Sequence, residues 1–124
     1  MPVLVAPPAP THSLPGARFT SLATPRRGSS ESSVWRVELA PGTPATPHQV
    51  TREEIFIVLS GRATVRLGDE RREASAFDAI VVPANTPFEI SACGDEPLHA
   101  MCCLPVGGQA RLGDGTTFVP PWAE

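Results

Sequence analysis

The chain has 124 residues, the size of a single domain, and its hydrophobic content of 41% and charged content of 19% are ordinary for a soluble globular protein. The net charge of -3 gives no reason to expect nucleic acid or an anionic membrane as a partner. The segment MPVLVAPPAP has no basic region and no long apolar run, so we expect neither a signal peptide nor a membrane anchor. The three cysteines show no CxxC spacing, which is typical of reduced thiols in a cytoplasmic protein.

Prolines and glycines interrupt the chain throughout and leave room only for short elements. Residues 1–16 are rich in proline and are expected to form an extended or disordered N-terminal arm. A short apolar run follows at 17–22. Residues 33–40 alternate between apolar and polar positions, and we expect Trp35 on the outer face of the fold or at a subunit interface. Residues 54–61 are continuously apolar, which indicates a strand buried on both faces.

The second half of the chain repeats this pattern of short apolar runs separated by turn residues. Further strands are expected at 62–67, 78–84, 88–92 and 98–104. The Gly/Pro-rich tail at 105–124 is expected to be held to the body by Phe118 and Trp122. Many short strands at close spacing predict an all-β sandwich or barrel that forms one domain over 17–124.

Residues 42–61 carry four residues at a characteristic spacing. Gly42, His48, Glu54 and Gly61 fall where the first motif of the cupin family has Gly, His, Glu and Gly, while Val50 stands at the position of a second His. In this stretch the chain therefore resembles the cupin family of jelly-roll β-barrels. The resemblance implies a motif core over 42–92.

Residues 77–92 resemble the second cupin motif, with Pro83 in register. Phe77 and Asn85 stand where that motif has glycines, and Phe88 stands where it has a histidine. Asn tolerates the left-handed turn conformation that Gly supplies, so the backbone of the motif is expected to survive. We do not expect the metal-binding function of the motif to survive.

The resemblance implies a divalent metal at the barrel centre, held by three His and one Glu. This chain keeps His48 and Glu54 and loses the other two ligands to Val50 and Phe88. Two protein ligands are fewer than a catalytic zinc or a non-haem iron site uses, so we expect no cofactor. The alternative is a divalent transition metal on His48 and Glu54, completed by Cys102, which alternation places on the inner face of its strand.

Without a metal, His48 and Glu54 are the candidate catalytic residues, because imidazole and a neighbouring carboxyl group can exchange protons near neutral pH. Glu53 lies one residue away and is expected to point to solvent. The pocket wall that binds the ligand is predicted to comprise Val50, Phe56, Phe88, Met101 and Cys102.

The predicted function is binding of a small organic molecule in the barrel, coupled to metal-independent acid/base chemistry of the isomerase, cyclase or lyase type. The alternatives are a metal-dependent oxygenase or isomerase with an incomplete ligand set, and a non-catalytic binding or structural cupin. The sequence therefore leaves open whether the protein is an enzyme. The resemblance also implies a homodimer formed through a barrel face and the N-terminal strand.

Overall fold

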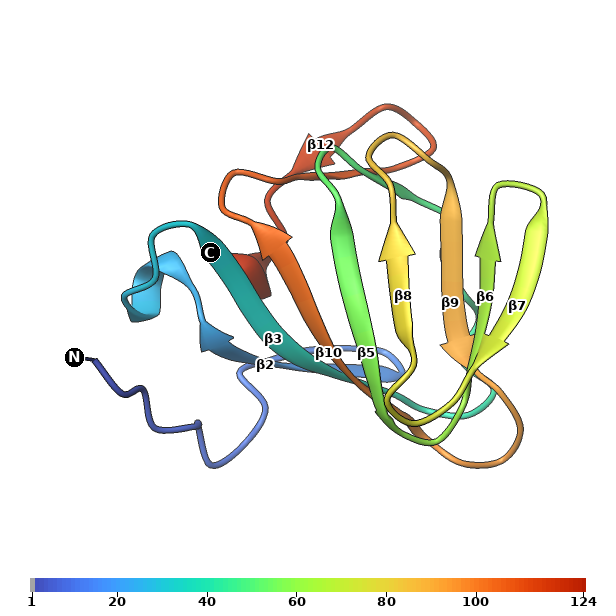
Figure 1. The fold of residues 1–124 in the computed structure, drawn as a ribbon, viewed down its shortest axis with the longest axis horizontal. Helices are drawn as coiled ribbons and strands as arrows, with labels where there is room; N and C mark the ends of the chain where they lie inside the picture. Colours follow the sequence, from blue (N-terminus) through green and yellow to red (C-terminus); the bar gives the residue numbers. More distant parts are fainter. Residues whose placement is uncertain (1) are drawn as a thin grey trace.

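The computed structural model describes residues 2–124, which form β-strands joined by turns and two short 3-10 turns (Figure 1). In this part of the chain no helix is long and apolar enough to cross a membrane. The elements, in chain order, are β1 (His12–Leu14), β2 (Ala17–Ala23), η1 (Pro25–Arg27), β3 (Ser32–Leu39), β4 (Gln49–Val50), β5 (Glu54–Ser60), β6 (Ala63–Leu67), β7 (Glu70–Ala74), β8 (Ala79–Val82), β9 (Phe88–Ala92), β10 (Leu98–Pro105), β11 (Ala110–Arg111), β12 (Thr117–Phe118) and η2 (Pro121–Ala123).

The strands build two walls that face each other. One wall is a six-stranded antiparallel sheet in the order β1-β2-β3-β10-β5-β8. The other combines the sheets β7-β6-β9 and β12-β11-β4, which an isolated antiparallel bridge between His48 and Phe88 connects. This arrangement is a jelly-roll barrel, and it confirms the all-β fold predicted from the sequence.

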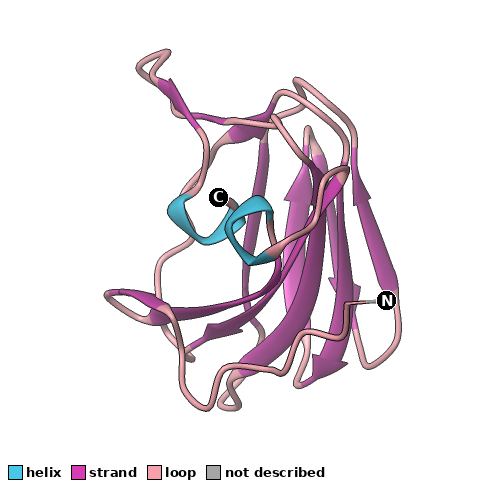
Figure 2. Ribbon diagram, turned by 90° about the vertical axis from the view of Figure 1, so that its left-hand side faces the viewer, coloured by secondary structure: helices cyan, strands magenta, loops and turns pink. Residues whose placement is uncertain are grey.

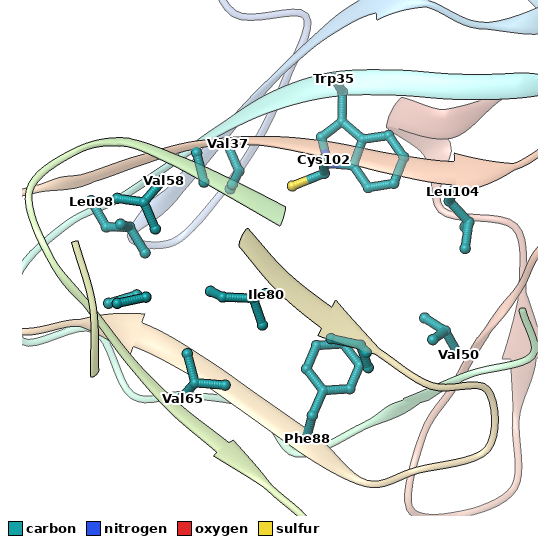
Figure 3. Close-up of a cluster of buried hydrophobic side chains, with 14 of the residues drawn as sticks. Trp35, Val37, Val50, Val58, Val65, Ile80, Phe88, Leu98, Cys102 and Leu104 are labelled. Atoms are coloured by element: carbon teal, nitrogen blue, oxygen red, sulfur yellow. The ribbon is translucent and has the colours of Figure 1, made fainter. Parts of the chain in front are cut away.

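Strand β3 shows how alternation fills the barrel. Trp35 and Val37 point inward and are buried, whereas Arg36 between them is exposed. Figure 3 shows Trp35 and Val37 in one cluster with Cys102 of β10 and Ile80 of β8. The prediction that Trp35 lies on the outer face or at an interface is therefore wrong, because it shares the inner face of β3 with Val37.

Strand β5 was predicted to be buried on both faces, and only its inner face is. Glu54 and Val58 point inward and are buried. Ile55 and Ile57 point outward and are half-buried, since nothing within residues 2–124 packs over the outer face of this sheet. Ile55 and Ile57 are thus part of an apolar outer surface on β5.

Both ends of the described chain pack against the barrel. Residues 12–14 of the predicted arm form β1, which pairs with β2. The segment outside the sheet is therefore shorter than the predicted 1–16, and Met1 lies outside the described residues. At the other end Trp122 stacks on Phe19 with ring centroids 3.6 Å apart, as the sequence predicted for this tryptophan. Figure 2 shows the two short helical turns beside each other, where Arg26 forms an ion pair with the terminal Glu124 at 2.7 Å.

The two turns of the second motif keep the backbone conformation of the glycines that they replace. Asn85 has φ of 59°, which confirms that asparagine supplies the left-handed turn. Phe77 has φ of 70°, a strained value for a bulky residue, and its side chain is 80% exposed.

Candidate functional site

The two walls enclose a cavity of about 310 Å³ that reaches the surface at one end. Its inner lining is almost entirely apolar, with side chains such as Val58 of β5, Ile80 of β8 and Leu98 of β10 pointing into the barrel (Figure 3). At the surface end it is bordered by Leu14 and Phe118, which are 54% and 36% exposed. The cavity therefore offers an almost entirely apolar surface to whatever enters it.

Most residues predicted for the site meet at this cavity. The lining includes five of them, from four separate segments of the chain: His48, Glu54, Phe56, Phe88 and Cys102. Cys102 is 1% exposed and faces inward, as alternation along β10 predicted. Glu53 is exposed, as predicted.

Two residues predicted for the pocket wall do not line it. Val50 is 2% exposed and belongs to the core next to the cavity, since its short strand β4 turns it toward other buried side chains. Met101 lies on the outer face of β10, opposite in direction to Ala100 and Cys102. The placement of Met101 in the pocket wall conflicts with strand alternation and is wrong.

Glu54 is the polar group deepest in the apolar lining. It begins β5, points inward and is 4% exposed. Among the described residues its carboxyl group forms no ion pair and no side-chain hydrogen bond. Burial raises its pKa to about 8. At neutral pH Glu54 is therefore mainly a neutral carboxylic acid, with a proton to donate to whatever occupies the cavity.

The thiol of Cys102 also faces this cavity. Burial raises its pKa well above the usual value, and the nearby charges of Glu54 and then Cys103 raise it further. Cys102 is thus a neutral thiol that behaves as a small apolar side chain of the wall.

A hydrogen bond fixes which ring nitrogen of His48 can accept a proton. Its Nδ1 lies 2.8 Å from the carbonyl oxygen of Thr46, and because a carbonyl only accepts, Nδ1 carries the proton and donates. In the neutral imidazole Nε2 then has the lone pair. The ring is held by Phe88, with centroids 4.3 Å apart, and by the backbone bridge to the same residue.

The structure brings His48 and Glu54 to one cavity without joining them. No hydrogen bond or ion pair links the two side chains within residues 2–124, and His48 uses Nδ1 on Thr46 instead. Glu54 therefore does not orient the imidazole. The two groups are an acid and a base on opposite walls of one cavity, Glu54 on the six-stranded sheet and His48 beside β9.

The donor set does not fit the metal site that the cupin resemblance implies. In the described part of the chain, no three His, Cys, Asp or Glu side chains lie close enough together to hold a metal ion. Phe88 places a benzene ring beside His48, where the family motif has a ligand. Cys102 does not complete a site with His48 and Glu54 either.

Sequence reasoning missed the border of the cavity. Residues 43–46 line it, as do Trp35 and the hairpin residue Leu14. Alternation could have identified Trp35, because Arg36 next to it is an outward position. Nothing in the sequence indicated Leu14, since its place depends on the pairing of β1 with β2.

Known proteins resemble this chain in sequence or in fold. A segment of 53 residues is 40% identical to the uncharacterized protein MJ1618 of Methanocaldococcus jannaschii. The matching segment covers 43% of this chain and 42% of that protein, so the match spans less than half the length of this relative. The solved structure of KdgF from Halomonas sp. is 27% identical, with a TM-score of 0.66 over 77% of this chain and 84% of that one. The polyketide cyclase RemF from Streptomyces resistomycificus is 19% identical, with a TM-score of 0.67 over 82% of this chain and 73% of that one. The family model for the cupin domain matches residues 35–104, more than half of the chain, and the chain therefore belongs to the cupin family.

Proposed function

We propose that this cupin binds a small, largely apolar organic molecule with a carbonyl oxygen in its barrel, and that Glu54 and His48 exchange protons with it. One observation carries the proposal: a carboxyl group without a partner in an apolar wall. A polar group without a partner costs up to about 1–3 kcal/mol when it is fully buried, and Glu54 avoids part of that cost because its carboxyl group faces the cavity, where an occupant can pair with it. A ligand oxygen that accepts the proton of Glu54 would satisfy it.

The proposed step uses the two groups together. Nε2 of His48 takes a proton from the carbon next to the carbonyl, and the electron pair of the broken C–H bond forms a C=C bond. Glu54 gives its proton to the carbonyl oxygen, so the product is an enol, with an imidazolium and a carboxylate left on the protein. Return of the enol proton to Glu54 and of a proton to the same carbon completes α-proton exchange; return of that proton to the opposite face or to a different carbon of the ligand would give an isomer. The apolar lining keeps bulk water away from the enol.

This proposal is tested by the exchange of α-protons of 2-octanone in D2O, followed by NMR. We expect the protein to accelerate exchange, because His48 is only partly buried and its imidazolium can trade its proton with solvent. Glu54→Gln and His48→Ala should each slow the protein-dependent exchange about 100-fold, the usual contribution of an acid or base. Glu53→Gln, one residue away but exposed, is the matched control and should exchange at the wild-type rate.

Treatment with EDTA should leave the exchange unchanged, because the proposed acid and base both belong to the chain. Loss of exchange with EDTA, with activity restored by a transition metal, would favour the metal-dependent alternative. Quenching of tryptophan fluorescence by 2-octanone without any exchange would leave a binding protein and remove the catalytic part of the proposal.

We also propose a homodimer through the outer face of the six-stranded sheet. Strand register places Ile55 between Cys103 and Val81 in one row, and Ile57 between Met101 and Ala79 in the next. These rows form an apolar surface on which Val81 is 49% exposed. Apolar sheet faces of this kind are typical of subunit interfaces.

Light scattering after size-exclusion chromatography tests the dimer. Wild-type protein should elute at twice the monomer mass, and Val81→Lys should elute as a monomer because two lysines would be buried across the two-fold axis. Thr117→Lys on the exposed strand β12 is the control and should stay dimeric. A wild-type monomer, or a dimeric Val81→Lys, would contradict this interface.

A further inference from the structure

We infer that the ligand carries a carboxylate, and that this group leaves the barrel through a slot beside β9 and binds Arg66 and Arg71 on the outer face of the β7-β6-β9 sheet. The inference rests on the proposed function for the apolar part of the ligand. It adds a carboxylate to the apolar ligand and names the residues that would bind that carboxylate.

We place the proposed slot where the chain before β4 stops pairing with β9. Pairing between them is limited to the bridge at His48 and Phe88, where each backbone N–H donates to the other residue's carbonyl oxygen at 3.1 and 2.9 Å. Hydrogen-bonded positions alternate along an antiparallel ladder, and Pro44, four residues before His48, has no N–H to donate toward β9. Within residues 2–124, no backbone hydrogen bond joins 43–47 to β9 beyond this bridge.

A second hollow lies on the other side of the slot. It has a volume of about 220 Å³ and is polar, in contrast to the barrel cavity. Ala45 and Ser91 line both spaces, so the hollow and the cavity share a wall at the slot. The lining of the hollow is Ala45, Thr64, Arg66, Arg71, Glu89 and Ser91.

The charges in this hollow are unbalanced. Arg66 of β6 lies directly opposite Arg71 of β7 on one side and opposite Glu89 of β9 on the other. Like charges directly opposite each other destabilise a sheet. Neither arginine forms an ion pair with a described residue, whereas the neighbouring Arg72 pairs with Glu70 at 3.6 Å.

An anion between the two guanidinium groups would relieve this repulsion. Two arginines and Glu89 leave one net positive charge, which suits a monoanion better than a doubly charged phosphate. Guanidinium groups bind planar carboxylates through paired hydrogen bonds, and the hydroxyl groups of Thr64 and Ser91 supply further donors. The residues therefore fit a carboxylic acid whose apolar skeleton extends through the slot into the barrel.

Titration of the full chain with octanoate and 1-octanol at neutral pH and low salt tests the inference. Tryptophan fluorescence reports on the barrel directly, because Trp35 and Trp122 line the cavity and the chain contains no tyrosine. We expect octanoate to bind about tenfold more tightly than 1-octanol, a preference that falls at high salt. Arg66→Gln and Arg71→Gln should each remove most of this preference and leave 1-octanol binding unchanged.

Two further variants separate the site from a general charge effect. Arg72→Gln makes the same charge change on the next residue of β7, which points to the other face, and should change neither affinity. Glu89→Gln should tighten octanoate binding by about threefold, because it removes the competing carboxylate.

The outcomes distinguish the inference from the proposed function. If 1-octanol binds and octanoate binds no more tightly, the carboxylate site is wrong and the apolar barrel site stands. If neither binds, both are wrong. An effect of Arg72→Gln as large as that of Arg66→Gln, or octyl phosphate binding more tightly than octanoate, would also overturn the assignment.

Discussion

The free energy of unfolding should decrease as the pH rises from about 5 to about 8, and Glu54→Gln should abolish this decrease. Glu54 has a pKa of about 8 in the folded protein, against 4.5 for an ordinary glutamate, and the cause is burial. Between these two values the folded state holds a proton that the unfolded state has lost. Unfolding therefore becomes easier as the pH rises.

The sign and the size follow from this difference in proton binding. A difference of one proton makes the free energy of unfolding fall by about 1.4 kcal/mol per pH unit. Below about pH 4.5 both states are protonated and Glu54 contributes no pH dependence. Above about pH 8 both states are ionised, and the folded protein carries the full cost of a buried carboxylate.

Urea unfolding at a series of pH values checks this prediction. Glu54→Gln keeps the shape of the side chain and removes its ionisation, so near pH 8 the variant should be more stable than the wild type. Glu53→Gln changes an exposed carboxyl group on the neighbouring residue and should follow the wild-type curve. A wild-type stability that is flat over this range would mean that Glu54 is ionised or paired, and it would remove the proton donor from the proposed chemistry.

The sequence predicts the position of Glu54 but not its protonation state. The spacing of Gly42, His48, Glu54 and Gly61 places the glutamate at the start of an inward-facing strand, and the structure agrees. Its protonation depends on the absence of a partner, which only the arrangement of all surrounding side chains decides. The sequence suggested His48 as that partner, yet His48 bonds to Thr46, two residues before it in the chain.

The outer hollow shows a second limit of sequence reasoning. Arg66 and Arg71 lie on consecutive strands of a hairpin, and hairpin pairing could have placed them opposite each other. Glu89 and Ser91 come from β9, and nothing local indicates that β9 pairs with β6. Ala45 joins the hollow through a loop that pairs with β9 only at His48. Sites assembled from such distant segments follow from topology, and periodicity along the chain does not reveal them.

Gly61→Ala should destabilise the protein far more than Gly68→Ala, although both glycines have positive φ. Gly61 has φ of 73° and Gly68 has φ of 58°, so a side chain at either position meets the left-handed penalty of about 1–2 kcal/mol. A Cβ atom on Gly68 would have nothing within 4 Å, and its cost should stay at that penalty. A Cβ atom on Gly61 would collide with the backbone carbonyl oxygen of Pro97.

That collision cannot be relieved by rotating a side chain, because Pro97 leads directly into β10. This strand lies between β3 and β5 in the large sheet and contributes Leu98, Ala100 and Cys102 to the cavity. We therefore expect Gly61→Ala to lower the free energy of unfolding by about 3 kcal/mol or more, and to weaken 1-octanol binding in the protein that remains folded. Equal losses of stability in Gly61→Ala and Gly68→Ala, measured by urea unfolding, would show that backbone conformation alone explains the glycine of the first motif. A larger loss for Gly61→Ala would show that the motif ends in glycine because the turn after β5 must pass against the start of β10.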